Sequence, residues 1–299
     1  MSNTQKKQLK RKRRKALQKR GPLTLVHSAA SAQPLPSLRA MEGVMAGMFG
    51  GVDGDEGTAV DRAQQVMYDA WEATEPKRRI ALARKALAIS GDCADAYVLL
   101  AEEVRDRHEA RQLLEQGVAA GERALGQGFF EENVGHFWGL LETRPYMRAR
   151  CSLAQILWDA GEREVAVTHY QELLRLNPND NQGVRDLLLP CLLELGRDKE
   201  AEGLVAAFEE DGTAMMSYSR ALLAFRRDGD CSESRSLLRA AIKENRHVPT
   251  FLLGRKRLPK SIPDYHGFGD ENEAICYLVD GANNWRATPG ALDWLASSE

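Results

Sequence analysis

Apolar residues recur at the three- and four-residue spacing of amphipathic helices from about residue 60 to residue 245, almost without interruption. Ala63, Met67 and Ala70 share one face of the first such segment, and Ala83 and Leu87 share one face of the second. No stretch of this region shows the alternating pattern of a half-buried strand. The pattern therefore predicts an all-α chain built from successive helices.

Glycines mark a regular period within this helical region. Gly161, Gly196 and Gly229 lie 35 and 33 residues apart, and each ends one predicted helix and precedes another. This is the period of a tetratricopeptide (TPR) repeat, in which two helices form each unit. We therefore predict a TPR-like α-solenoid of about five helix pairs.

Residues 149–178 give the clearest repeat. Leu153, Ala154, Ala166, Tyr170 and Pro178 follow one another in the order of the TPR pattern, with a small residue where the two helices should cross. Two regions depart from it. The repeat phase breaks between residues 121 and 145, where glycine and aromatic residues predict an insertion, and the pattern ends after residue 245.

The C-terminal residues 246–299 are too irregular for another helical pair. Asp270 and Glu273 form a capping-box-like start for a short helix over 274–278, and Thr288 with Pro289 predicts the start of a final turn. Because the last repeat of a solenoid cannot bury its apolar face alone, we expect this extension to act as its cap.

The N-terminal residues 1–57 carry no helical periodicity of apolar residues. The 41 Lys and Arg residues of the chain include ten within residues 1–20, which hold no Asp or Glu, so 31 basic residues face 43 acidic ones in the remainder. We predict a disordered basic tail and linker over 1–57, followed by repeats over 58–245. Alternatively, residues 6–20 provide weak, non-specific contacts with nucleic acid or anionic lipid.

The remaining composition narrows the class of protein. Five cysteines lie far apart with no CxxC pair, which argues against a zinc site or a disulfide framework. No apolar run reaches the roughly 20 residues that a membrane-spanning helix needs, and no signal-peptide core follows the basic start. We therefore expect a cytoplasmic protein with no membrane span, metal or cofactor.

Four segments are more specific than repeat packing requires: 135–149 (GHFWGLLETRPYMRA), 177–183 (NPNDNQG), 210–214 (EDGTA) and 265–271 (YHGFGDE). They resemble the suppressor-of-tumorigenicity-seven family, and the resemblance covers roughly residues 114–295. It implies a TPR-like helical protein without an established enzymatic activity. Animal members are described as membrane proteins, so this chain resembles a shorter, soluble form.

The family-like segments also hold the most reactive side chains. His136, Glu142 and Arg144 offer acid–base or anion chemistry, but His136 and Glu142 would point roughly 120° apart on a helix, and no nucleophile or metal accompanies them. We favour packing of Trp138 and Tyr146 into the repeat break. A further set of polar residues at the next helix start would bind a ligand or simply cap that helix: Asn179, Asp180 and Asn181.

The concave face of a TPR solenoid is lined by the first helix of each pair, and this gives candidate partner contacts. The expected positions lack the Lys and Asn pattern of domains that clasp chaperone tails, so that class of ligand is not supported. We predict a non-enzymatic scaffold that binds a protein or peptide, with a nucleic-acid- or ribosome-associated protein as the alternative. The candidate groove contacts are Arg148, Gln155, Trp158, Arg185, Arg226 and Arg227.

Overall fold

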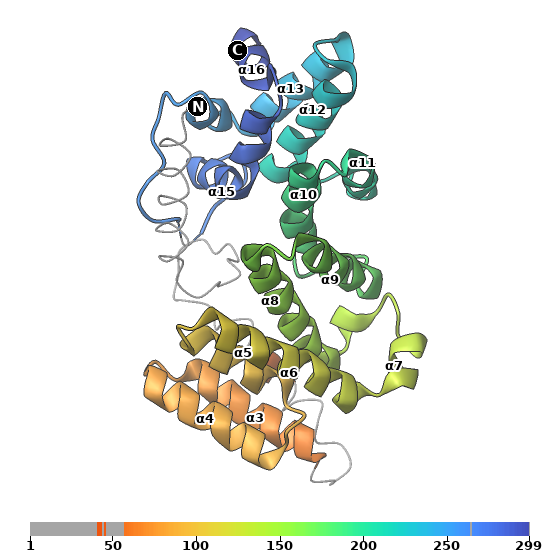
Figure 1. Ribbon diagram of the computed structural model, residues 1–299, viewed down its shortest axis with the longest axis vertical. Coiled ribbons are helices and arrows are strands. Elements are labelled where there is room, and N and C mark those ends of the chain that lie inside the picture. The colour runs from red at the N-terminus through yellow and green to blue at the C-terminus, as the bar shows by residue number, and fades with distance from the viewer. Residues whose placement is uncertain (1–40, 44, 46–56, 264, 299) are drawn as a thin grey trace.

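The computed structural model describes residues 41–43, 45, 57–263 and 265–298, and over these residues the chain is built from helices and loops. Five helix pairs stack one after another along the long axis (Figure 1). The predicted all-α, TPR-like architecture of about five pairs is confirmed. The pairs are α3 (Ala59–Glu72) with α4 (Pro76–Ile89), α5 (Ala94–Glu103) with α6 (Arg107–Leu125), α8 (Arg144–Ala160) with α9 (Arg163–Leu176), α10 (Val184–Leu195) with α11 (Asp198–Ala207), and α12 (Ala214–Asp228) with α13 (Ser232–Glu244).

The three periodic glycines end the first helix of the last three pairs. Gly161 and Gly196 adopt left-handed conformations, with φ of 92° and 70°, at the ends of α8 and α10. Gly229 ends α12 with φ of 69°. Glycine adopts these positive φ values without the steric cost that a Cβ would add.

Local chemistry also fixes several helix starts. Thr58 and Asp61 form a reciprocal capping box at the start of α3. Asp106 accepts from two backbone N–H groups at the start of α6, and Thr213 accepts from Met216 N at the start of α12. These side chains satisfy N–H groups that have no partner within the helix.

The helices pack through small residues and continuous apolar clusters. Ala166 of α9 is fully buried in an apolar cluster that includes residues of α8, as expected for a small residue where the two helices of the repeat cross. At Gly121 of α6, an added Cβ would lie 2.8 Å from Tyr146 Cβ of α8, so the two helices cross at close range. This approach is possible because Gly121 has no side chain.

The insertion predicted between residues 121 and 145 folds as short helical turns. It comprises α7 (Gln127–Glu132) and two 3-10 turns, η1 (Phe137–Gly139) and η2 (Leu141–Thr143). Phe137 is fully buried among Phe129, Phe130 and Tyr146, with ring centroids 5.0–6.3 Å apart. Thr143 Oγ1 donates to the carbonyl oxygens of Phe137 and Leu140, which holds the two turns together.

The C-terminal extension contains more helix than the sequence predicts. A short α14 (Val248–Leu252) was not expected, α15 (Glu271–Ala287) continues well beyond residue 278, and α16 (Ala291–Ser297) follows Gly290. Asp270 caps α15 by accepting from Glu273 N at 2.7 Å. The capping box is not completed, because the Glu273 carboxylate instead accepts from Ala214 N at 2.9 Å and Gly269 N at 2.7 Å.

Helix α15 packs against α10 and α12, which are the first helices of the last two pairs (Figure 1). Trp285, Tyr277 and Leu278 of α15 are buried in one apolar cluster with Tyr218 and residues of α14 and α16. The extension therefore completes the core of the last pair. The division at residues 57 and 245 stays a prediction, and residues 6–20 lie outside the described part of the chain.

Candidate binding face of the solenoid

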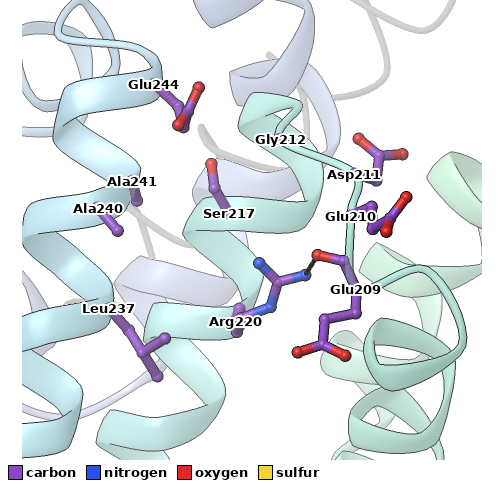
Figure 2. A pocket seen from close by; sticks show the side chains of 10 residues that line it. All are labelled: Glu209, Glu210, Asp211, Gly212, Ser217, Arg220, Leu237, Ala240, Ala241 and Glu244. Atoms are coloured by element: carbon purple, nitrogen blue, oxygen red, sulfur yellow. Dashed lines mark hydrogen bonds between the residues drawn. The ribbon is translucent and has the colours of Figure 1, made fainter.

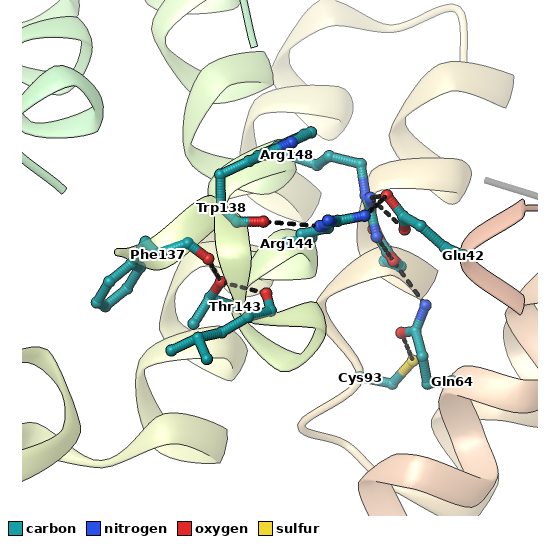
Figure 3. A network of polar contacts seen from close by, with 10 residues as sticks. Glu42, Gln64, Cys93, Phe137, Trp138, Thr143, Arg144 and Arg148 are labelled. Atoms are coloured by element: carbon teal, nitrogen blue, oxygen red, sulfur yellow. Dashed lines mark hydrogen bonds and ion pairs between the residues drawn. The ribbon is translucent and has the colours of Figure 1, made fainter. Parts of the chain in front are cut away.

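A buried polar cluster lies on the first helices of the three N-terminal pairs. Arg148 of α8 is only 6% exposed, and its guanidinium donates to both carboxylate oxygens of Asp95 on α5, at 2.8 and 2.6 Å. The same guanidinium donates to Glu42 Oε2 at 2.8 Å (Figure 3). Burying a charge without a partner is costly, so Arg148 needs these carboxylates.

A second arginine, one helical turn from Arg148, binds the Glu42 carboxylate. Arg144 donates through Nη1 to Glu42 Oε1 at 3.1 Å and through Nε to the carbonyl of Trp138 at 3.0 Å. Each guanidinium also lies over an indole ring, Arg144 at 5.2 Å from the Trp138 centroid and Arg148 at 5.3 Å from the Trp71 centroid. Glu42 is therefore held between two arginines that are themselves fixed by aromatic rings.

Charge balance explains the electrostatics of this cluster. Burial alone would lower the pKa of Arg148, but the Asp95 and Glu42 carboxylates outweigh burial and raise its pKa. The adjacent Tyr68 has its pKa raised to about 12, by burial first and then by Glu42 and Asp95. Gln64 of α3 donates to Asp95 Oδ2 at 2.8 Å, so all three first helices contribute to the cluster.

Sequence reasoning missed two members of this cluster. Asp95 lies in the first turn of α5, where an acidic residue is common, and it pairs with Arg148, 53 residues later. Glu42 lies in the region predicted as tail and linker, yet it is 5% exposed. A single acidic residue in a segment without periodicity gave no signal of this contact.

The candidate groove residues of α8 have different environments. Arg148 is a buried ion-pair partner rather than an exposed contact. Gln155, two turns further along the same stripe of α8, is half-buried. Trp158 is also half-buried, and the guanidinium of Arg163 lies 5.0 Å from its ring centroid.

The other three candidate arginines form ion pairs with carboxylates of this chain: Arg185, Arg226 and Arg227. Arg185 pairs with Asp180 at 3.0 Å and Asp211 at 2.8 Å. The partly exposed Arg227 pairs with carboxylates that include Glu202, at 3.2 Å. Their roles as partner contacts stay predictions.

Helix α15 covers the face to which Arg226 belongs. Arg226 donates to Asp198 Oδ1 at 2.8 Å on α11, and to Thr288 Oγ1 at 2.8 Å just after α15. Asn284 of α15 donates to the carbonyl of Pro190 on α10 at 3.2 Å. The C-terminal half of the first-helix face is therefore closed by the chain's own helix.

The family-like segment around His136 does not form one helix. His136 and Glu142 are exposed, His136 just before η1 and Glu142 within η2, so the helical angle assumed for them does not apply. Tyr146 is 1% exposed, whereas Trp138 is half-buried and contacts Arg144. These positions support the packing interpretation of the segment.

The polar turn before α10 caps that helix. Asp180 is 4% exposed and accepts from Val184 N at 2.7 Å and Arg185 N at 2.9 Å. Asn179 and Asn181 are exposed on either side of it. Of the two interpretations of this turn, the geometry supports the cap.

One acidic residue of this region was not singled out as a candidate. Asp186, in the first turn of α10, has a pKa raised to about 7 by burial, with Arg185 opposing the rise and Asp211, Asp180 and Glu273 adding to it. Its Oδ1 atom has no hydrogen-bond partner among the described residues. This carboxylate is held under electrostatic strain.

A separate hollow of about 210 Å³ opens between α12, α13 and the loop before α12 (Figure 2). Its polar lining combines one guanidinium, which donates to the carbonyl of Glu209 at 3.2 Å, with several carboxylates. This excess of negative charge disfavours anions. The charged lining residues are Glu209, Glu210, Asp211, Arg220 and Glu244.

The described residues hold neither a candidate metal site nor a helix that could cross a membrane. They contain no group of three or more His, Cys, Asp or Glu side chains arranged to hold a metal ion. Among their helices, none has the length and apolar character that crossing a membrane requires.

Comparison with known proteins places the chain in a family. The family model described as ST7 protein matches residues 48–298. The chain belongs to the ST7 protein family. It is 27% identical over 268 residues to the Drosophila melanogaster protein ST7 homolog, covering 80% of this chain and 49% of that relative. It is 30% identical over 255 residues to the Mus musculus suppressor of tumorigenicity 7 protein-like, and the match covers 77% of this chain and 45% of that relative.

The family resemblance inferred from the sequence is thus confirmed, and the chain spans about half the length of these curated relatives. Among solved structures it is similar to YrrB, described as a TPR protein with an unusual peptide-binding site. That similarity has a TM-score of 0.45 and 21% identity, and covers 62% of this chain and 86% of YrrB.

Proposed function

We propose that this ST7-family chain is a non-enzymatic, cytoplasmic scaffold that binds a protein or peptide on the first-helix face of its three N-terminal pairs. The observation that carries the proposal is the contact of Glu42 with Arg144 and Arg148. There, the face formed by α3, α5 and α8 holds a short segment through one carboxylate. A surface that holds one such segment has the chemistry to hold another.

Burial distinguishes the two halves of the first-helix face. In the C-terminal half, Trp285 of α15 is fully buried and Tyr277 is 3% exposed, so removing this helix would expose large apolar side chains. In the N-terminal half, Met41 and Met45 on either side of Glu42 are 46% and 39% exposed. These two methionines are not buried as the aromatic residues of α15 are, which favours the N-terminal half as the partner site.

The proposal of a scaffold rather than an enzyme rests on the same geometry. The charged groups of the Glu42 cluster pair with one another and leave no acid–base group directed toward a reacting atom. His136 and Glu142 are exposed on separate turns. The arrangement suits recognition by charge-assisted hydrogen bonds.

Photo-crosslinking from matched positions tests the location of binding. A photoreactive side chain replaces Gln155 on the α8 stripe or, as a control, the exposed Thr168 on the second helix α9. We expect a discrete crosslinked partner from position 155 and not from position 168. That partner, once identified and purified, should bind the wild-type chain in calorimetry and bind the Gln155→Glu variant, which adds a negative charge to this stripe, at least tenfold more weakly. Equal crosslinking from both positions would contradict the proposed face.

A further inference from the structure

We propose that Arg144 and Arg148 form a carboxylate-recognition site, and that Glu42 occupies it as an internal competitor of an acidic partner peptide. The proposal rests on the scaffold function proposed above and names the chemistry of its partner. With Glu42 present, the two guanidinium groups face two carboxylates, those of Glu42 and Asp95. Without Glu42, the cluster keeps one uncompensated positive charge, which favours a replacement carboxylate.

The site remains assembled when Glu42 is absent, because other groups fix both arginines. Arg148 keeps its two hydrogen bonds to Asp95, and Arg144 keeps its bond to the Trp138 carbonyl. Each guanidinium also keeps its indole ring. Removing Glu42 therefore exposes a preformed anion site and need not unfold the face.

The close contact between Gly43 and Tyr68 adds a steric requirement to the recognition of a carboxylate. A Cβ added at Gly43 would lie 3.0 Å from Cγ of Tyr68 on α3, so the segment backbone lies directly on this ring. A larger residue at this position would push the segment away from α3. The site therefore selects an acidic residue followed by a small one.

The internal segment is suited to competition rather than permanent closure. It buries the Glu42 carboxylate, whose side chain is 6% exposed, while Met41 and Met45 remain exposed. Because the segment belongs to the same chain, its effective concentration at the two arginines is high. A partner must present the same chemistry in a more extensive contact to displace it.

A peptide added in trans provides the test. The probe is a fluorescent peptide of residues 37–49, made with Glu or Gln at position 42, and the receptor is the full chain, wild type or Glu42→Ala. We expect the Glu42→Ala chain to bind the Glu peptide at least tenfold more tightly than the Gln peptide. The wild-type chain should bind the Glu peptide at least tenfold more weakly than the Glu42→Ala chain does, because its own segment competes.

Two arginine variants in the Glu42→Ala background separate the site from general charge. Arg144→Ala should reduce binding of the Glu peptide at least tenfold, whereas Arg175→Ala, which removes an exposed arginine paired with Glu172 on α9, should leave it unchanged. A Glu peptide with Gly43→Leu should also lose binding. Circular dichroism must show the same helical content in all variants.

Defined results overturn this inference. If the Glu42→Ala chain is folded but binds the Glu and Gln peptides equally, or binds neither, the carboxylate site does not exist. If position 155 crosslinks to a partner whose affinity is the same for wild type and Glu42→Ala, the scaffold proposal stands and the internal competition is wrong. If the Glu42→Ala chain binds that partner at least tenfold more tightly than wild type does, the result supports both the scaffold function and the internal competition.

Discussion

At the scale of single residues, Asp186 gives a prediction with a definite pH dependence. Its pKa in the folded protein is about 7, above the ordinary value of 3.8, because of burial and of nearby carboxylates. The folded state therefore holds this proton more tightly than the unfolded state does. The resulting stability is fully present below about pH 4 and is lost as the pH rises through 7.

The Asp186→Asn variant should remove this loss. We expect it to be more stable than wild type at pH 8, by up to roughly 4 kcal/mol because the pKa of Asp186 rises from 3.8 to about 7 and one pKa unit corresponds to about 1.4 kcal/mol, and to show little gain at pH 4. Urea unfolding at the two pH values measures this. Asp106→Asn serves as a contrast, since its carboxylate accepts two backbone N–H groups that lower its pKa, so its loss should destabilise the protein at pH 8. Lower stability of Asp186→Asn at pH 8 would refute the assigned strain.

The aromatic residues of the insertion should differ in their contribution to stability. Phe137 is fully buried, so Phe137→Ala should lower the free energy of unfolding by about 3–5 kcal/mol. Trp138→Ala should cost less, because that side chain is half-buried, and His136→Ala should change stability little. Thermal unfolding of the three variants gives the order. A loss for His136→Ala as large as that for Phe137→Ala would contradict the packing account.

At the scale of helices, two glycines form a matched pair. A Cβ at Gly121 would lie 2.8 Å from Tyr146 Cβ, whereas a Cβ at the exposed Gly203 within α11 meets nothing within 4 Å. We expect Gly121→Ala to destabilise the protein by about 1–3 kcal/mol through overpacking. Gly203→Ala should stabilise it by about 0.5–1 kcal/mol, because alanine favours the helix. Chemical unfolding of both variants checks this, and the same sign for both would refute the crossing geometry.

Helices are also the scale at which sequence prediction worked best here. Apolar periodicity and the glycines at 161, 196 and 229 report on local geometry, and they predicted the helix pairs and their ends. Periodicity could not predict where α15 packs, because its position depends on contacts between residues far apart in sequence. Asn284 and Pro190, for example, are 94 residues apart. The Glu42 contact was missed for the same reason, since its partner Arg148 lies 106 residues away.

At the scale of the whole molecule, the C-terminal helices complete the solenoid. A chain ending at residue 245 would uncover Tyr218 and Leu222 of α12, both fully buried against the extension. We expect this truncated chain to bind a hydrophobic dye and to melt at a lower temperature than the full chain. Phe268→Ser, at a position that is 86% exposed, is the control and should melt like wild type. An unchanged melting temperature of the truncated chain would show that α12 does not need this cover.

The ion pair between Asp95 and Arg148 also affects the order of folding while the protein is synthesised. The two residues are 53 positions apart, and ribosomes add about 5–20 residues per second, so Asp95 is made roughly 3–10 s before its partner. During that interval, the residues that form the apolar contacts of α3 to α6 have already been synthesised. The guanidinium of Arg148, which pairs with the buried Asp95 carboxylate, has not. The N-terminal pairs can therefore reach their final arrangement only after α8 has been synthesised, although solenoid repeats otherwise depend mainly on their neighbours.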